Sequence, residues 1–167
     1  MAGKQVGFIG VGIMGGGMVR NVLKGGFDVK VFDMNPDAVA EIVAEGATAA
    51  TSAADAADGA DFIQVVVPGP RDVEAVVFGE GGVAETVREG AIVIQHATID
   101  PSTMKSVAAG LAEKGVKTLD APLLRTPTHA ASGNLGFPVG GDKETLEEAR
   151  ELLMSVGDTI YETGEIG

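Results

Sequence analysis

Short apolar runs rich in β-branched residues alternate along the chain with longer stretches rich in alanine, glutamate and lysine. The apolar runs lack polar alternation and cover residues 6–9, 29–32, 62–67, 91–94, 116–119 and 135–139. Uninterrupted apolar strands are typical of a parallel sheet that is covered on both faces. The intervening stretches predict helices over residues 14–24, 36–44, 52–57, 73–77, 101–114 and 143–156. This alternation predicts an α/β fold, a doubly wound and mainly parallel sheet with helices on both faces.

Polar residues mark the beginning of three of these helices. Asn35 precedes Pro36, Asp100 precedes Pro101, and Asp142 stands before the last helix. Short polar side chains at this position accept hydrogen bonds from the free N–H groups of a first helical turn, and proline fits the first helical position. We therefore expect helices to begin at these three places.

Composition narrows the possible functions. The 167 residues correspond to roughly one domain, and 45% of them are hydrophobic, which is enough for a packed core. The 12 basic and 24 acidic side chains give a net charge of -12, which argues against nucleic-acid binding. Because the chain has no cysteine, disulfide scaffolds, thiol nucleophiles and the usual zinc sites are excluded, and we predict no metal. Without a targeting signal or an apolar run of about 20 residues, we expect a cytoplasmic protein that does not enter membranes.

The first predicted strand leads directly into Gly10-Val11-Gly12-Ile13-Met14-Gly15, a G-x-G-x-x-G pattern that a predicted helix follows. In a dinucleotide-binding site the first glycine permits a tight turn, the second lets a pyrophosphate approach the backbone, and the third lets the helix pack on the strand. The positive end of the helix faces the phosphates. The pattern therefore predicts a Rossmann-type cofactor site. Gly16 and Gly17 extend the run without an explanation in the sequence.

Asp33 ends the second predicted strand and supplies the acidic partner of this pattern. A carboxylate at this place accepts hydrogen bonds from the adenosine ribose hydroxyls and repels the 2′-phosphate of NADP. The following Met34 and Asn35 supply no cation that would offset the repulsion. We therefore predict NAD as the cofactor, with NADP less favoured. The alternative is that Asp33 only caps the turn before Pro36.

Further motifs extend the pattern over nearly the whole chain. They are Met18 and Asn21, Val66-Val67-Pro68, Thr98-Ile99-Asp100-Pro101, Asp120-Ala121-Pro122, Gly133 with Leu135, Val139-Gly140-Gly141 and Gly157. In this order they resemble the β-hydroxyacid dehydrogenase family, which includes 3-hydroxyisobutyrate dehydrogenase, tartronate semialdehyde reductase and relatives of 6-phosphogluconate dehydrogenase. The resemblance implies the NAD-binding domain of an oxidoreductase that transfers a hydride between nicotinamide and a small 3-hydroxyacid or its semialdehyde.

The resemblance also assigns the site residues. It places the cofactor against Gly10, Val11, Gly12, Ile13, Met14, Gly15, Asp33, Met34, Val67, Pro68 and Thr98. It places the substrate against Thr98, Leu124, Arg125 and Thr126. Within the first set, Val67 and Pro68 would border the adenosine and Thr98 the nicotinamide ribose.

Two departures from the family's pattern bear on the substrate. Ala97 replaces the serine that usually precedes Thr98, and the neighbouring His96 is then either a proton carrier or, as we favour, a structural residue. Leu123-Leu124-Arg125-Thr126 replaces the usual Val-Ser-Gly-Gly, and members that act on sulfonated aldehydes carry Arg-Thr there. Arg125 could hold a carboxylate, sulfonate or phosphate through two hydrogen bonds, so we expect an anionic substrate. The alternative is that Arg125 is a surface ion-pair partner.

The last residues of the sequence indicate where the NAD-binding domain ends. We expect residues 1–162 to form the NAD-binding domain and residues 163–167 to begin the connection to an all-helical domain that completes the family's enzymes. By resemblance, the lysine that serves as general acid or base lies just beyond Gly167, so we expect no catalytic residue in this chain and no turnover by it alone. We expect the full-length protein to form a homo-oligomer. The alternative functions are a non-catalytic NAD-binding or sensing module and, less favoured, another Rossmann enzyme such as a methyltransferase.

Overall fold

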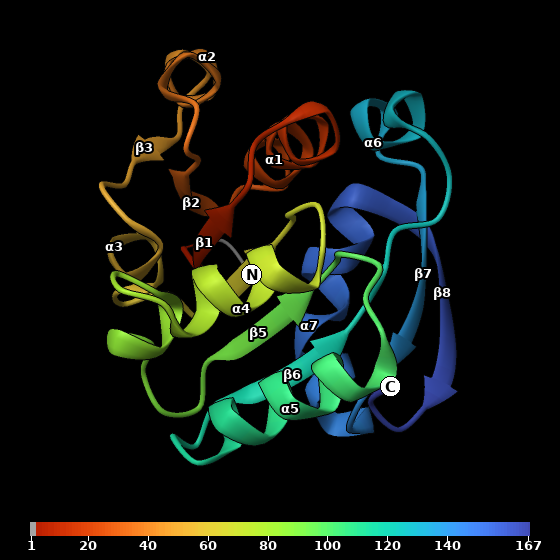
Figure 1. The fold of residues 1–167 in the computed structure, drawn as a ribbon. Coiled ribbons are helices and arrows are strands. Elements are labelled where there is room, and N and C mark those ends of the chain that lie inside the picture. The colour runs from red at the N-terminus through yellow and green to blue at the C-terminus, as the bar shows by residue number, and fades with distance from the viewer. Residues whose placement is uncertain (1–2) are drawn as a thin grey trace.

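In the computed structural model, residues 3–167 are described, and their strands form one eight-stranded sheet in the order β3-β2-β1-β4-β5-β6-β7-β8 (Figure 1). The strands are β1 (Gln5–Ile9), β2 (Asp28–Phe32), β3 (Thr48–Ala49), β4 (Phe62–Val65), β5 (Ile92–Gln95), β6 (Lys117–Asp120), β7 (Leu135–Gly140) and β8 (Gly157–Gly164). Neighbouring strands are parallel except for β6 and β7, which are antiparallel. The predicted mainly parallel α/β sheet is confirmed.

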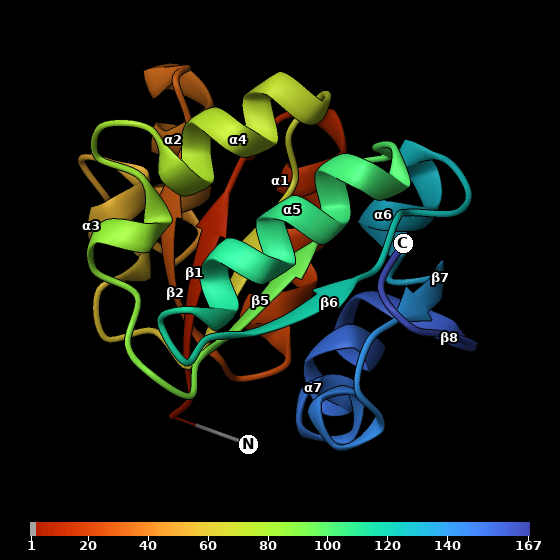
Figure 2. The ribbon, with the colours of Figure 1, turned by 60° about the horizontal axis from the view of Figure 1, so that its bottom comes forward.

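Helices cover both faces of the sheet, and Figure 2 shows α4 and α5 lying across one of them. The helices are α1 (Ile13–Lys24), α2 (Pro36–Ala44), α3 (Ala53–Ala57), α4 (Pro70–Phe78), α5 (Pro101–Ala112), α6 (Pro127–Ser132) and α7 (Lys143–Val156), with a 3-10 turn at Val83–Glu85. Buried side chains of α1, α2, α6 and α7 form one core with the sheet, and those of α3, α4 and α5 form a second core on the opposite face. Every residue of β4 and β5 is buried because both faces of these central strands are covered.

The expected helix starts are confirmed by their capping hydrogen bonds. Asn35 accepts a hydrogen bond from the backbone N–H of Asp37 at the start of α2, with an oxygen–nitrogen distance of 3.1 Å. Asp100 and Asp142 do the same for α5 and α7. Hydrogen bonds from the Ser102 and Thr103 side chains hold the pKa of the Asp100 carboxyl well below its usual range.

Three elements were not expected from the apolar pattern. The strand β3 has only two residues, the helix α6 only six, and β8 lies at an edge of the sheet. Five of the eight residues of β8 are exposed, Asp158 and all four from Tyr161 onward, because an edge strand is covered less than a central one. The helix α4 also begins at Pro70, three residues before the expected 73–77, because Gly69 and Pro70 form its first turn.

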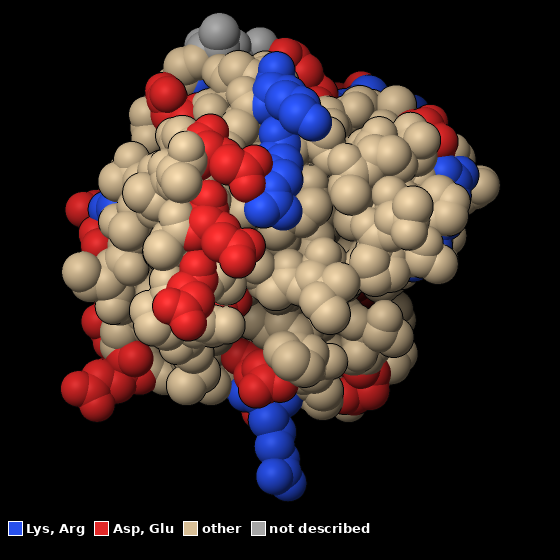
Figure 3. Space-filling model, turned by 90° about the horizontal axis from the view of Figure 1, so that it is seen from above, with Lys and Arg blue, Asp and Glu red and all other residues tan. Residues whose placement is uncertain are grey.

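Charged side chains lie in adjacent rows on the outer face. Seen from above, acidic and basic side chains run side by side over the part of the surface that carries α1 and α2, whereas the side towards α6 is mostly uncharged (Figure 3). Arg20 of α1 reaches Glu45 just after α2, with 2.7 Å between Nε and Oε1. Arg20 is thus paired with an acidic side chain on this face.

Two features are absent from the described residues, 3–167. None of their helices is long and apolar enough to cross a membrane. They also contain no group of three or more histidine, cysteine, aspartate or glutamate residues that could hold a metal ion.

Candidate cofactor-binding site

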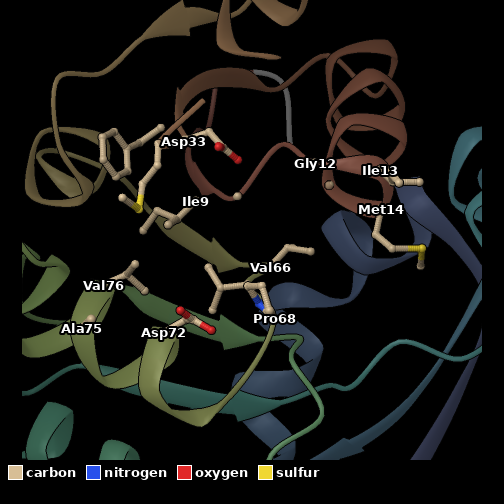
Figure 4. Close-up of a pocket in the computed structure, with 15 residues that line it drawn as sticks. Ile9, Gly12, Ile13, Met14, Asp33, Val66, Pro68, Asp72, Ala75 and Val76 are labelled. Carbon is tan, nitrogen blue, oxygen red and sulfur yellow. The ribbon is translucent and has the colours of Figure 1, made fainter. Parts of the chain in front are cut away.

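A cleft of about 550 Å³ opens where the carboxyl ends of β1, β2 and β4 meet (Figure 4). The chain runs from β1 to β2 on one side and returns to β4 on the other side of β1, so the cleft lies where the strand order reverses. Ligands of open α/β sheets bind at such a point. The cleft is lined by Ile9, Gly10, Gly12, Ile13, Met14, Gly15, Phe32, Asp33, Met34, Val66, Val67, Pro68, Asp72, Ala75 and Val76.

The three glycines of the pattern have different tasks in this cleft. Gly10 has a positive φ of 92°, and a Cβ there would lie 2.0 Å from the Val66 carbonyl oxygen. A Cβ on Gly15 would lie 1.9 Å from the Gly10 carbonyl oxygen, so neither position has room for a side chain. A Cβ on Gly12 would meet no atom within 4 Å among the described residues. The fold therefore requires Gly10 and Gly15, whereas the open space beside Gly12 fits a ligand that approaches the backbone.

The first turn of α1 leaves its backbone donors available to such a ligand. Gly12 is the N-cap, and in the described part of the chain no side chain caps this helix and no acidic residue lies in its first turn. The first N–H groups of a helix need partners, and the helix dipole favours an anion there. The end of α1 that lines the cleft is therefore suited to a phosphate.

Asp33 joins the end of β2 to the glycine-rich loop. Its Oδ2 accepts a hydrogen bond from the backbone N–H of Val11 at 2.7 Å, and its Oδ1 accepts one from the N–H of Asn35 at 2.8 Å. The carboxylate is half-buried and lines the cleft. Asp33 therefore makes the expected turn contact and faces the cleft at the same time, so the two interpretations of this residue do not exclude one another.

Nine of the residues expected at the cofactor line the cleft, but Val11 and Thr98 do not. Val11 is 4% exposed and takes part through its backbone N–H. Sequence reasoning missed Ile9, Phe32, Val66, Asp72, Ala75 and Val76. Asp72 belongs to the first turn of α4, and Figure 4 shows it across the cleft from Asp33. The signal that could have found it is Pro70, which marks the helix start two residues earlier.

The helix α6 lies against α1 (Figure 1), and this contact explains Gly17. A Cβ on Gly17 would lie 2.9 Å from the backbone nitrogen of Ala131. Asn21, one turn further along α1, is 9% exposed and donates from Nδ2 to the Ala130 carbonyl at 2.9 Å. The helix α6 is therefore held at a fixed distance from α1, the helix that begins at the glycine-rich loop.

The residues expected at the substrate lie outside the cleft. Thr98 is exposed on the loop between β5 and α5. Leu124 is 42% exposed, and its N–H donates to the Gly136 carbonyl at 2.9 Å. Thr126 is the N-cap of α6, and its hydroxyl lies 2.8 Å from the Nδ1 of His129. These groups thus lie at the carboxyl edge of the sheet but do not line the cleft.

Arg125 is paired with acidic and carbonyl oxygens. Its Nη1 donates to Asp158 Oδ2 at 2.9 Å and also to the Asn134 carbonyl. This bond holds the pKa of the Asp158 carboxyl below its usual range. Arg125 has a positive φ of 82°, a conformation that is uncommon for a residue with a side chain. The guanidinium is about one-third exposed, so a face of it remains open to solvent.

His96 is enclosed at the end of β5. Its side chain is 2% exposed, its Nδ1 lies 2.7 Å from the Ala121 carbonyl oxygen, and its Nε2 lies 2.9 Å from Gln64 Oε1. Burial lowers the pKa of its imidazole to about 4. A ring without access to solvent and with both nitrogens in contact with protein atoms favours the structural interpretation over the proton carrier.

Comparison with known proteins decides the family. Residues 5–164 match the family described as the NAD binding domain of 6-phosphogluconate dehydrogenase. The chain belongs to the NAD-binding domains of the β-hydroxyacid dehydrogenase family. It is 40% identical over 164 residues to the NAD-dependent L-serine dehydrogenase of Pseudomonas aeruginosa, covering 98% of this chain and 55% of the relative. It is 38% identical over 162 residues to the 3-sulfolactaldehyde reductase of Escherichia coli, covering 97% of this chain and 54% of the relative.

Solved structures of the family have the same fold. The crystal structure of 3-hydroxyisobutyrate dehydrogenase from Salmonella typhimurium superposes with a TM-score of 0.92 and 30% identity, over 98% of this chain and 57% of that one. The structure of Mycobacterium tuberculosis 3-hydroxyisobutyrate dehydrogenase with L-serine superposes with a TM-score of 0.93 and 30% identity, over 98% of this chain and 55% of that one. These matches confirm the Rossmann-type fold and the resemblance.

The family assignment carries a coarse function. This chain is an NAD-binding domain of hydroxyacid dehydrogenases, and it spans about half the length of the curated relatives it matches. The relatives named here are oxidoreductases of small hydroxyacids or aldehydes, so the comparison gives no support to the sensing-module alternative. Structures of similar fold contain NADP+ in one case and NAD+ in another, so membership does not fix the choice between the two.

Proposed function

We propose that this chain is the cofactor-binding domain of an NAD-dependent oxidoreductase acting on a small anionic 3-hydroxyacid or its semialdehyde. One observation carries the proposal: the backbone beside Gly12 is open to the cleft, while Gly10 and Gly15 are packed against neighbouring backbone. A fold needs no glycine at an open position with ordinary backbone angles. A ligand that lies against the backbone does need one.

The residues of the cleft fit the parts of NAD. The first turn of α1 and the backbone at Gly12 would hold the pyrophosphate, and Asp33 would accept hydrogen bonds from the adenosine ribose. Val67, Pro68 and Met34 supply apolar walls for the adenosine. When bound, NAD supplies the acceptor or donor of a hydride.

The preference for NAD over NADP rests on charge. Two carboxylates, Asp33 and Asp72, line the cleft from opposite sides, and among the described residues that line it there is no lysine or arginine. A 2′-phosphate near Asp33 would meet a like charge with no cation to offset it. We therefore propose NAD as the natural cofactor.

Backbone NMR of the isotopically labelled chain tests the binding mode. Titration with NAD should shift the amide resonances of Gly12, Ile13 and Met14 most, because their N–H groups would meet the pyrophosphate. The amide of Arg150 serves as the unaffected reference, because this residue of α7 lies outside the cleft and pairs with Glu147 and Glu162. Shifts confined to residues outside the cleft, or no shifts at millimolar NAD, would contradict the proposal.

Thr98, Leu124, Arg125 and Thr126 are proposed to face the substrate, with Arg125 as the group that meets its anionic end. The support is chemical: the guanidinium carries more donors than its contacts with Asp158 and Asn134 use, and it is part-exposed. In the intact gene product, Arg125→Gln should raise the KM for sulfonated or carboxylated substrates. An unchanged KM across a screen of small hydroxyacids would remove Arg125 from the site.

The remaining parts of the proposal concern the whole protein. We propose that residues 1–162 form the cofactor domain, although β8 itself ends at Gly164. The proton-transferring lysine is proposed to lie outside this chain, which would bind cofactor without turnover. Lys117, for example, is engaged with Glu148 at 2.7 Å on the surface. A cytoplasmic homo-oligomer is the assembly we propose for the complete enzyme.

A further inference from the structure

His96 contacts two other strands through its imidazole. It follows β5 directly, its Nδ1 faces the carbonyl of Ala121 after β6, and its Nε2 faces the Gln64 side chain in β4. The ring also packs on Phe137 of β7, with 5.8 Å between ring centroids. One buried side chain thus joins β4, β5 and β6 near their carboxyl ends.

These contacts determine which nitrogen carries the proton. The Ala121 carbonyl can only accept a hydrogen bond, so Nδ1 must donate. If Gln64 Oε1 also accepted from Nε2, the ring would be a buried imidazolium, and burial opposes that charge.

The Gln64 amide resolves this conflict when it is turned by half a rotation. With Oε1 facing the ring, its buried Nε2 has no partner among the described residues. After the rotation, the amide N–H₂ donates to the unprotonated Nε2 of a neutral ring. The rotation removes both the buried charge and the unpaired donor, because amide oxygen and nitrogen occupy similar positions.

The three joined strands lead into three loops of the proposed site. β4 leads to Val66–Pro68 at the cofactor cleft, β5 leads to the loop that carries Thr98, and Ala121 begins the segment that carries Leu124 and Arg125. The contacts at His96 therefore connect the cofactor side of the sheet with the segment proposed for the substrate.

We propose that His96 is a positioning residue: as a neutral ring protonated at Nδ1, it fixes the spacing of these three loops and so sets Thr98 and the 121–126 segment against the nicotinamide end of the cofactor. This inference rests on the proposed function for the identity of the ligand. The arrangement of the ring with Gln64 and Ala121 does not depend on it.

Nitrogen-15 NMR of the imidazole side chains tests the ring directly. At neutral pH the His96 Nδ1 should show the shift of a protonated nitrogen and Nε2 that of an unprotonated one. Gln64→Leu should weaken this preference, because it removes the donor to Nε2. A native ring protonated at Nε2, or a doubly protonated ring, would overturn the arrangement.

Ligand binding by three variants tests the positioning role. His96→Asn can still donate to the Ala121 carbonyl, whereas His96→Leu cannot. Val93→Ala removes buried carbon atoms from the same strand on the opposite face and controls for general loosening of β5. By calorimetry, His96→Leu should weaken the binding of NAD about tenfold. It should weaken the binding of ADP-ribose less than about twofold, because ADP-ribose lacks the nicotinamide that meets these loops. His96→Asn should recover most of the loss.

The outcomes separate the two claims. If the native chain binds neither NAD nor ADP-ribose, the proposed function fails whatever the state of the ring. If it binds both and His96→Leu weakens them equally, or weakens neither, the positioning role fails and the proposed function stands. The positioning role would also be overturned if Val93→Ala changed the ratio of NAD affinity to ADP-ribose affinity as much as His96→Leu does.

Discussion

Two neighbouring regions of the carboxyl edge of the sheet are built by different means. The glycine-loop region, residues 9–15 with Asp33 and 66–68, is shaped by backbone contacts: Gly10 and Gly15 pack against carbonyl oxygens, and Asp33 accepts the Val11 N–H. The His96 region, residues 96–100 and 121–126, is held by the His96 side chain, which contacts the Gln64 side chain of β4 and the Ala121 carbonyl after β6. The first arrangement follows a motif of fixed spacing, in which the glycine-rich turn is joined to the aspartate that ends the next strand. The second depends on partners that belong to no such motif, because they meet only where β4, β5 and β6 lie side by side.

The largest expected effect comes from one methyl group in the glycine-loop region. Gly10→Ala places a Cβ 2.0 Å from the Val66 carbonyl oxygen at a φ of 92°. We expect it to destabilise the fold by about 4 kcal/mol or more and to abolish NAD binding, as measured by urea unfolding and calorimetry. The matched control is Gly12→Ala, which should leave the unfolding curve unchanged but still weaken the binding of NAD. A stable Gly10→Ala variant that binds NAD would break the account of this region.

The pH dependence of stability probes the His96 region. In the folded chain, burial holds the pKa of His96 at about 4, below its ordinary value of 6.5. Above pH 6.5 both states are neutral and stability is complete. As pH falls from 6.5 towards 4, only the unfolded chain binds the proton, so stability falls by roughly 3 kcal/mol in total and no further below pH 4.

Urea unfolding between pH 7.5 and 4 measures this loss. Carboxylates titrate in the same range, so the native chain is compared with His96→Asn, which retains them. The variant should lose less stability on acidification. Equal pH dependence of the two proteins would contradict the buried, neutral ring.

Asp33 tests whether the glycine loop and the ribose contact can be separated. Asp33→Asn keeps an oxygen that can accept from the Val11 N–H, so folding stability should stay close to native while NAD weakens about tenfold. Asp33→Ala leaves the buried Val11 N–H without its partner and should cost a further 1–3 kcal/mol or so of stability. Unfolding and calorimetry of the pair distinguish the two roles. Equal stability of the two variants would show that the carboxylate does not hold the loop.

The smallest expected effect lies at the surface of the His96 region. Asp158→Asn removes the charge that faces Arg125, and because both side chains are part-exposed the melting temperature should change little, and less at high salt. The same variant should strengthen binding of sulfonated hydroxyacids to the intact gene product, since the guanidinium would be freed from its acidic partner. Weaker binding would show that Asp158 orients Arg125 instead of competing for it.

The difference between the regions also explains what the sequence could predict. The sequence predicts the three capped helices because each cap lies next to the helix that it begins. It also predicts the glycine pattern and Asp33, because these follow a fixed spacing along the chain. The partners of His96, Gln64 and the Ala121 carbonyl, depend on which strands are neighbours, and no local pattern encodes that. Gly17 was unexplained for the same reason, since its neighbour Ala131 belongs to α6, a short helix that the apolar pattern did not show.

Asp72 and β8 illustrate two other features that the hydrophobic pattern of the sequence does not predict. Asp72 lines the cleft because α4 begins at Pro70, three residues earlier than its apolar residues indicate. β8 carries the polar residues of an edge strand, so it lacks the apolar run by which β4 and β5 were recognised. In both cases polar positions determine the structure, and hydrophobic patterning does not detect them.

Calorimetric titration of the native chain with NAD and, in parallel, with NADP tests the central claim most directly. Asp33 and Asp72 face the cleft, and no lysine or arginine lines it in the part of the chain that the structure describes, so NAD should bind and NADP should bind at least about tenfold more weakly. NADP binding as tight as NAD, or no binding of either, would contradict the account.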